Sequence, residues 1–153
     1  MMTQKTTLER NASSTRKNYC FACGPDNPGG MHLKFFADAS GRKYFCNFRL
    51  SNRYAGPPGH CHGGIIATIL DDAMSKLNKL RDLPAATARM TVEYLRPVPL
   101  HTSLRVESHE ISKRGRRLTR KAEICDAKGT VLARSRGVFV ILDSRHIFQR
   151  KRQ

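Results

Sequence analysis

The sequence predicts an α+β protein in which an antiparallel sheet wraps around one long central helix. An apolar run from about residue 63 to residue 80 has the spacing of a helix and ends before Pro84. After Pro84, apolar and polar residues alternate in several long stretches separated by turns. Successive hairpins of this kind form antiparallel sheets, and the helix supplies the apolar surface that the sheet covers.

The segment before the helix divides into a basic leader, a tight loop and two strands. Residues 1–18 are polar and basic, and we expect them to be disordered. Turn-forming residues are dense over 23–30, which predicts a tight loop. Two strands rich in aromatic residues are expected next, at 31–36 and 43–50, with a turn between them at 39–41. An irregular segment at 51–61 then leads to the helix.

Four strands account for the chain after the helix, at residues 86–95, 103–111, 118–126 and 131–142. Gly115 and Gly129 mark the turns of the last two hairpins. Alternation in the first of these strands places four residues on one side, namely Ala88, Met90, Val92 and Tyr94. The folded domain is therefore expected over residues 19–142, followed by a basic tail over 143–153.

The chain is strongly basic, with a formal net charge of +16 over 153 residues. The excess lies in the leader, in the tail and in residues 113–121. Such a surface attracts polyanions, including phosphate-bearing molecules, nucleic acids and anionic membranes. No apolar run approaches the roughly 18 residues of a membrane-spanning helix, and the leader lacks the apolar segment of a secretory signal. We therefore expect a soluble, cytoplasmic protein.

Five cysteines, an odd number, indicate reduced thiols. Cys20 and Cys23 have the spacing of half a zinc knuckle, but a structural zinc site needs four ligands. His60, Cys61 and His62 could complete one only if the fold brought them close. The sequence therefore favours two buried or partly buried thiols in a turn, with no metal.

The segment from His62 to Met74 carries the strongest indication of chemistry. Gly63 and Gly64 stand at the start of the helix, where the lack of a Cβ lets another group approach the backbone. The first N–H groups of a helix have no intrahelical partner and would stabilise an oxygen that gains negative charge. Asp71 lies eight residues after Gly63 within an apolar face, where a carboxylate is costly unless it is paired or used.

A purely structural interpretation of this segment is also open. A glycine pair before a helix is often only a turn, and Asp71 could be exposed. Adjacent helical positions differ by about 100°, so Asp72 is expected to face solvent or to cap a neighbouring group. His62 could act as a base, but hydrogen bonding within the loop is favoured for it.

These motifs resemble the hotdog-fold acyl-CoA thioesterases, in particular the phenylacetate-pathway type of the 4-hydroxybenzoyl-CoA thioesterase superfamily. The resemblance covers residues 19–142 and rests on four segments, Cys20–Pro28, His62–Asp71, Glu93–Pro97 and Gly129–Arg134. It implies a hotdog fold and hydrolysis of acyl-CoA to the free acid and CoA. CoA is part of the substrate, so no cofactor is implied.

The resemblance also assigns roles to individual residues. Gly63 would polarise the thioester carbonyl through its N–H, and Asp71 would attack it or activate water. Thr87 would help to hold that water. The acid and the glycine would come from different subunits of a homodimer, which could pair into a tetramer. Relatives often carry Asn or Gln at the positions of Ala55 and Gly56.

The remaining candidates concern substrate binding. Because Ala55 and Gly56 lack an amide side chain, Asn52 is a candidate for positioning water or substrate. Lys113 and Arg114 are candidates for the phosphates of CoA, although a solvated hairpin explains them equally well. A pocket for an apolar acyl or aryl group is expected beside the helix, lined by Ile65, Ile69, Met74 and the strand from Met90.

Two other function classes compete with hydrolysis. A hotdog protein could bind acyl-CoA or an acyl carrier without turnover, which the missing amide would favour. Binding of nucleic acid through the basic surface is less favoured, because the strands offer few aromatic residues for stacking. Release of thiol from acyl-CoA separates the first class from the second.

Overall fold

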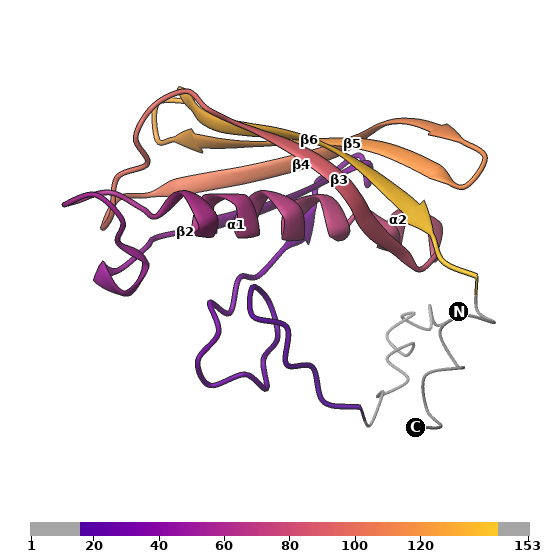
Figure 1. The fold of residues 1–153 in the computed structure, drawn as a ribbon, viewed down its shortest axis with the longest axis horizontal. Coiled ribbons are helices and arrows are strands. Elements are labelled where there is room, and N and C mark those ends of the chain that lie inside the picture. The colour runs from indigo at the N-terminus through magenta and orange to yellow at the C-terminus, as the bar shows by residue number, and fades with distance from the viewer. Residues whose placement is uncertain (1–15, 144–153) are drawn as a thin grey trace, which may run out of the picture.

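A computed structural model describes residues 16–143, in which one long helix packs against a single curved sheet (Figure 1). The sheet is antiparallel with six strands in the order β1-β2-β4-β5-β6-β3. Most of the predicted leader and tail falls outside the described residues. In the described part, no helix has the length and apolar character needed to cross a bilayer.

The strands form an edge hairpin, two long central hairpins and a crossover back to the opposite edge. Their bounds are Phe36–Ala37 (β1), Lys43–Phe48 (β2), Ala85–Tyr94 (β3), Leu104–Arg114 (β4), Arg117–Asp126 (β5) and Val131–Ile141 (β6). The predicted turn glycines Gly41, Gly115 and Gly129 have φ of +68°, +57° and +81°, which a Cβ would disfavour. The last four predicted strands and the turns that join them are therefore confirmed.

The predicted strand over 31–36 is wrong for most of its length. The N–H of Met31 donates to the carbonyl of Phe21, and the N–H of Leu33 donates to the carbonyl of Ala22. This segment is therefore bonded to the preceding loop, and only Phe36–Ala37 joins the sheet. A short 3-10 helix, Asn52–Tyr54 (η1), precedes the central helix.

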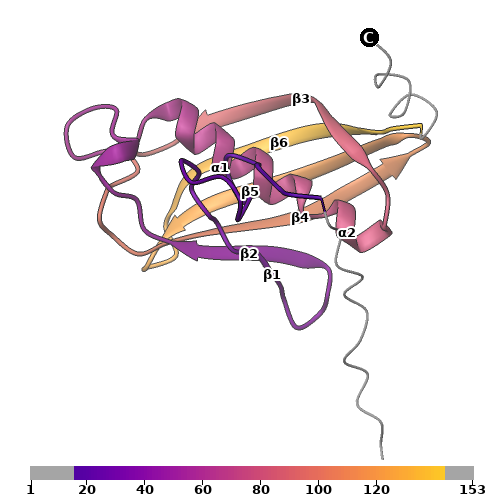
Figure 2. The ribbon, with the colours of Figure 1, turned by 90° about the horizontal axis from the view of Figure 1, so that it is seen from below.

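Helix α1, Gly63–Ser75, crosses one face of the sheet (Figures 1 and 2). It ends earlier than the predicted residue 80, and a turn separates it from the four-residue helix α2, Asn78–Arg81. Buried polar side chains of the sheet donate hydrogen bonds to carbonyl groups at the end of α1. The hydroxyl of Ser108 donates to the carbonyl of Ala73 at 2.6 Å, and the guanidinium of Arg120 donates to that of Met74 at 3.1 Å.

The core lies between α1 and the sheet. Five residues of α1 are buried, namely Ile66, Ile69, Leu70, Ala73 and Met74. They face buried side chains of the sheet, among them Val106, Leu118, Ile124 and Phe139. At Gly137 a Cβ would stand 3.1 Å from the Met74 methyl, so this glycine lets helix and sheet pack closely.

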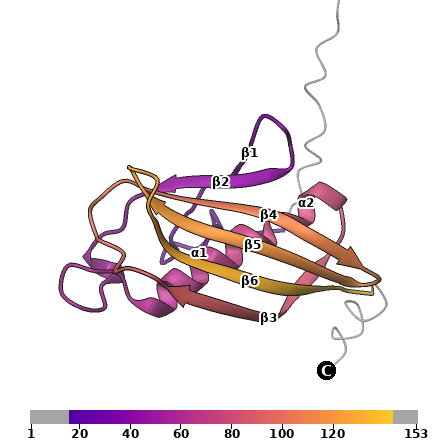
Figure 3. The same cartoon turned by 90° about the horizontal axis from the view of Figure 1, so that it is seen from above.

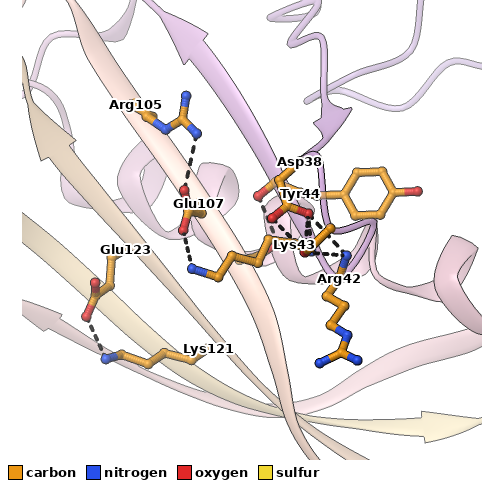
Figure 4. Close-up of polar contacts among 10 residues, drawn as sticks. Asp38, Arg42, Lys43, Tyr44, Arg105, Glu107, Lys121 and Glu123 are labelled. Carbon is orange, nitrogen blue, oxygen red and sulfur yellow. Dashed lines mark hydrogen bonds and ion pairs between the residues drawn. The ribbon is translucent and has the colours of Figure 1, made fainter.

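The opposite face of the sheet is open along its strands (Figure 3). It carries charged side chains, among them Lys43, Glu107 and Lys121. Glu107 contacts both Lys43 and Arg105, at 3.0 and 3.2 Å, and Lys121 contacts Glu123 at 2.6 Å (Figure 4). Part of the large positive charge is therefore paired locally on this face.

Candidate active site

The loop before α1 holds the start of the helix in place. The N–H of His62 donates to the carbonyl of Tyr54, and an isolated bridge joins Ala55 to Cys61. At Gly56 a Cβ would stand 2.7 Å from the His62 Cα, so the loop requires glycine there. Of the two positions at which the family resemblance implies an amide, Ala55 and Gly56, the second is therefore closed to any side chain.

His62 caps α1 rather than standing free as a base. Its Nδ1 accepts a hydrogen bond from the N–H of Gly64 at 2.9 Å. The neighbouring Cys61 is buried, and burial raises the pKa of its thiol to about 11. This thiol therefore stays protonated near neutral pH and provides no nucleophile beside the helix start.

The two glycines differ in what surrounds them. A Cβ on Gly64 would lie 3.1 Å from Nδ1 of His62, so glycine makes room for the capping ring. A Cβ on Gly63 would meet only the Tyr94 ring, at 3.5–3.6 Å, which is ordinary contact. The N–H of Gly63 pairs with no acceptor that the structure describes. Nothing within the described chain therefore requires glycine at position 63.

Asp71 and Thr87 meet as the family resemblance implies. The hydroxyl of Thr87, on β3, donates to Oδ1 of Asp71 at 2.6 Å, and Asp71 is half-buried. A β-bulge causes this contact. The register between β3 and β6 shifts between Thr87 and Arg89, which leaves Ala88 as the extra residue.

The bulge corrects the predicted alternation of β3. Cross-strand partners share a face, and Thr87 pairs with the buried Phe139 while Met90 pairs with Gly137. Both therefore face α1, although Met90 is three positions after Thr87. Strict alternation from Met90 would place Thr87 on the opposite face, and this is wrong because the bulge changes which residues point inward.

Tyr94 joins the site, although the sequence analysis gave it no role. Its hydroxyl donates to the carbonyl of Gly63 at 2.9 Å, and the residue is 55% exposed. Tyr94 pairs with Ala133, which places it on the same face as Thr87. The odd spacing of the two residues hid this relation in the sequence.

The acid and the helix start are far apart within one chain. Eight residues of α-helix span about 12 Å along the axis, so Asp71 and the N–H of Gly63 cannot meet around one carbonyl. Both lie beside β3, an edge strand of the described sheet. Nine of its ten residues pair with β6 on one side, and most of its side chains are exposed.

The other predicted residues lie away from this pair. Asn52 is exposed, and its Oδ1 bonds to the His101 ring at 2.9 Å. Lys113 and Arg114 are exposed at the free end of the β4–β5 hairpin. Lys113 shares a sheet row with Thr87 but stands three strands away, about 14 Å at the usual strand spacing.

One further expectation is wrong, and for Asp72 one of the two expected alternatives is wrong. Ile69 and Met74 are fully buried between α1 and the sheet, so they line no pocket beside the helix of the described chain. Asp72 does not face solvent, because its side chain is only 12% exposed and contacts Cys20 and Cys23. His60, Cys61 and His62 do not join those cysteines, since they lie at the opposite end of α1.

Comparison with known sequences identifies proteins that resemble this chain. The sequence profile of the thioesterase superfamily matches residues 58–133, a segment that includes Gly63, Asp71 and Thr87. The chain is similar to this superfamily over that segment, and its sheet and central helix form the hotdog fold.

Individual relatives agree with this assignment. Acyl-coenzyme A thioesterase THEM4 of Xenopus laevis is 29% identical over 110 residues, which are 71% of this chain and 50% of that protein. The chain spans about half the length of the curated relatives it matches first.

Solved structures show the same fold. The crystal structure of a thioesterase superfamily protein superposes with a TM-score of 0.76 at 30% identity, covering 80% of this chain and 60% of that one. The PaaI protein from the phenylacetic acid degradation operon of E. coli has a TM-score of 0.62 at 18% identity, covering 66% and 73%. At that identity the likeness concerns the fold alone.

Proposed function

We propose that this protein hydrolyses acyl-CoA thioesters to the free acid and CoA, in the manner of the phenylacetate-pathway thioesterases. The observation that carries the proposal is the half-buried carboxylate of Asp71, held by the Thr87 hydroxyl at 2.6 Å. Curated relatives that are named acyl-coenzyme A thioesterases support it. Withdrawing a carboxylate partly from water is costly unless a cation or backbone group compensates, and the described partner of Asp71 is one neutral hydroxyl.

The Gly63 N–H supplies the second part of the proposed chemistry. Glycine in a helix costs roughly 1 kcal/mol relative to alanine, and no contact within the described chain requires it at this position. A group that approaches the backbone from outside accounts for it. The unpaired N–H at the positive end of α1 would bind the thioester oxygen and stabilise the charge that develops there.

Asp71 then has one of two tasks. It removes a proton from the water that attacks the carbonyl carbon, or it attacks that carbon itself and forms an anhydride that water cleaves. In both cases the carbon–sulfur bond breaks and CoA leaves as its thiol. Thr87 orients the carboxylate through its hydrogen bond.

The separation of Asp71 from Gly63 makes a homodimer part of the proposal. An edge strand of ten residues offers unpaired N–H and C=O groups to a second copy. A second β3 beside it would bring another α1 to the same edge. Asp71 of one copy could then act on a carbonyl bound at Gly63 of the other. Such dimers could pair further into tetramers.

The CoA portion would find cationic groups at the rim of the site. Lys113 and Arg114 stay candidates for its phosphates, because both are exposed and belong to the basic segment over 113–121. The acyl or aryl group would lie along α1 between the two copies, beside the half-buried Ile65 and Met90.

Hydrolysis of a panel of short, medium, long and aryl CoA esters tests the proposal. We expect Asp71→Asn to lose roughly 10²–10⁴-fold in kcat, the usual contribution of a general base. Asp82→Asn is the matched control, because Asp82 is exposed in a left-handed cap that asparagine tolerates. Full turnover by a folded Asp71→Asn variant would overturn the mechanism.

Binding of acyl-CoA without hydrolysis is the second candidate function. It is favoured by Ala55 and Gly56, which carry no amide at the two positions where the family resemblance implies one, and Gly56 admits no side chain at all. Saturable binding of acyl-CoA by the wild-type protein, with no release of thiol across the panel, would identify a sensor rather than an enzyme.

A further inference from the structure

The loop before β1 carries a cluster that the proposed hydrolysis does not use. This loop lies against α1 on the side away from the sheet (Figures 1 and 2). Cys20 and Cys23 approach Oδ1 of Asp72, with Sγ–Oδ1 distances of 3.8 and 3.5 Å. The three ligand atoms all lie within 4.8 Å of one another.

The loop is shaped to present both thiols. The N–H of Gly24 donates to the carbonyl of Cys20 at 2.8 Å, which closes a tight turn around the two cysteines. A Cβ on Gly24 would stand 2.4 Å from the Cys20 nitrogen, so only glycine fits. The side chain of Asn18 accepts from the Cys20 N–H at 3.0 Å and fixes the entry to the turn.

The distances match those of a tetrahedral metal site. With zinc–sulfur bonds of about 2.3 Å and zinc–oxygen bonds of about 2.0 Å, a sulfur and an oxygen lie about 3.5 Å apart. Two sulfurs in such a site lie about 3.8 Å apart. The observed sulfur–oxygen distances of 3.5 and 3.8 Å need almost no adjustment to hold an ion.

The charge of the cluster matches a divalent cation. Lys76 lies 3.5 Å from Oδ2 of Asp72 and 2.6 Å from Sγ of Cys23. Two thiolates and one carboxylate carry three negative charges, and Lys76 neutralises one of them. The remaining two would be balanced by a divalent ion. Oδ2 of Asp72 is itself buried and accepts no hydrogen bond from the residues described.

We propose that Cys20, Cys23 and Asp72 bind a divalent ion that prefers thiolate ligands, with zinc as the first candidate. Cys20 is exposed, so water can complete the coordination from the solvent side. The ion joins the loop over residues 18–33 to α1. A disulfide between Cys20 and Cys23 would use the same two thiols, but it would not explain why the Asp72 carboxylate lies beside them.

Zinc content of the full chain tests the site, with protein purified under reducing conditions, incubated with excess zinc and then gel-filtered. We expect a single zinc ion per chain in the wild type. Cys23→Ser and Asp72→Asn should bind zinc at least about tenfold more weakly. Cys125→Ser and Asp82→Asn are the matched controls, since both residues lie outside the cluster, and should retain the ion.

A second measurement covers the case in which Cys23→Ser fails to fold. Cobalt titrated into metal-free wild type should produce a thiolate-to-cobalt charge-transfer band, and removal of zinc by a chelator should expose two further thiols to a thiol reagent. Wild type that takes up no zinc, or that gives no charge-transfer band, overturns the proposal. None of these readouts uses acyl-CoA, so their failure is independent of the proposed hydrolysis.

Discussion

Replacing Gly63 with alanine should make the protein more stable and less active. The new methyl group would meet the Tyr94 ring at 3.5–3.6 Å, so the folded chain accommodates it without movement. Alanine has fewer unfolded conformations than glycine and favours a helix, which should raise the free energy of unfolding by roughly 0.4–1 kcal/mol.

The same methyl group would stand beside the N–H that we propose as the oxyanion donor. Alanine keeps this N–H, so the effect comes from the methyl group holding the thioester oxygen away from it. Complete loss of one such donor lowers kcat by about 10²–10³-fold, or roughly 2.7–4 kcal/mol, which is the upper bound for this variant. Urea unfolding and acyl-CoA hydrolysis, measured on the same preparation, separate the two effects. A Gly63→Ala variant that is as stable as predicted and keeps the wild-type kcat would refute this role of Gly63.

Gly64→Ala provides the matched comparison one residue later. Its Cβ would lie 3.1–3.2 Å from the His62 ring, so the ring must shift and its hydrogen bond to the Gly64 N–H weakens. Loss of an N-cap costs about 0.5–2 kcal/mol. This variant should therefore be less stable than wild type, in contrast to Gly63→Ala.

Three further predictions concern other parts of the molecule. Arg120→Met removes a fully buried cation that binds Glu110 and the end of α1, and should lower the free energy of unfolding by about 3–5 kcal/mol in urea titrations. Thr87→Val should reduce kcat with little change in stability, and Thr87→Ser should restore it, because only the hydroxyl contacts Asp71. Burial opposes ionisation of Glu107, but its two basic neighbours outweigh burial and lower the pKa of this carboxyl below its usual 4.5. The ionised carboxylate of Glu107 therefore stabilises the fold fully above pH 4.5, and this stabilisation is lost as the pH falls through the lowered pKa. Thermal unfolding measured across this pH range should depend less on pH in Glu107→Gln than in wild type.

The sequence predicted most of the sheet because local signals and tertiary structure agree there. Each long hairpin has alternating side chains and a glycine at a turn that needs positive φ, as at Gly115 and Gly129. The failures arise where tertiary contacts replace local ones. Residues 31–35 look like a strand, but their backbone groups bond to the Cys20–Cys23 loop.

The end of α1 shows the same limit. The apolar pattern continues to residue 80, yet the helix stops at Ser75 because Ser108 and Arg120 bind the carbonyls of its last turn. Both side chains come from strands more than thirty residues away. No local pattern around Ser75 contains that information.

The sequence predicted individual residues of the candidate site only where the family motif assigns a role to a particular position. The resemblance assigned Asp71 and Thr87 to one site, and the structure brings them within 2.6 Å. The bulge at Ala88 makes that contact possible, and its only trace in the sequence is an odd spacing between Thr87 and Tyr94. Strict alternation would have put these two residues on opposite faces.

The adjacent acids of α1 show why helix phase decides function. Asp71 and Asp72 differ by about 100° around the axis, and both are withdrawn from solvent. One faces the edge strand through Thr87, and the other faces the cysteine loop. A shift of phase by one residue would move one acid into the surroundings of the other and leave an apolar neighbour, Leu70 or Ala73, in the second place. The sequence shows two acids in an apolar helix, and only the packing on both sides separates the surroundings on which the two proposed roles rest.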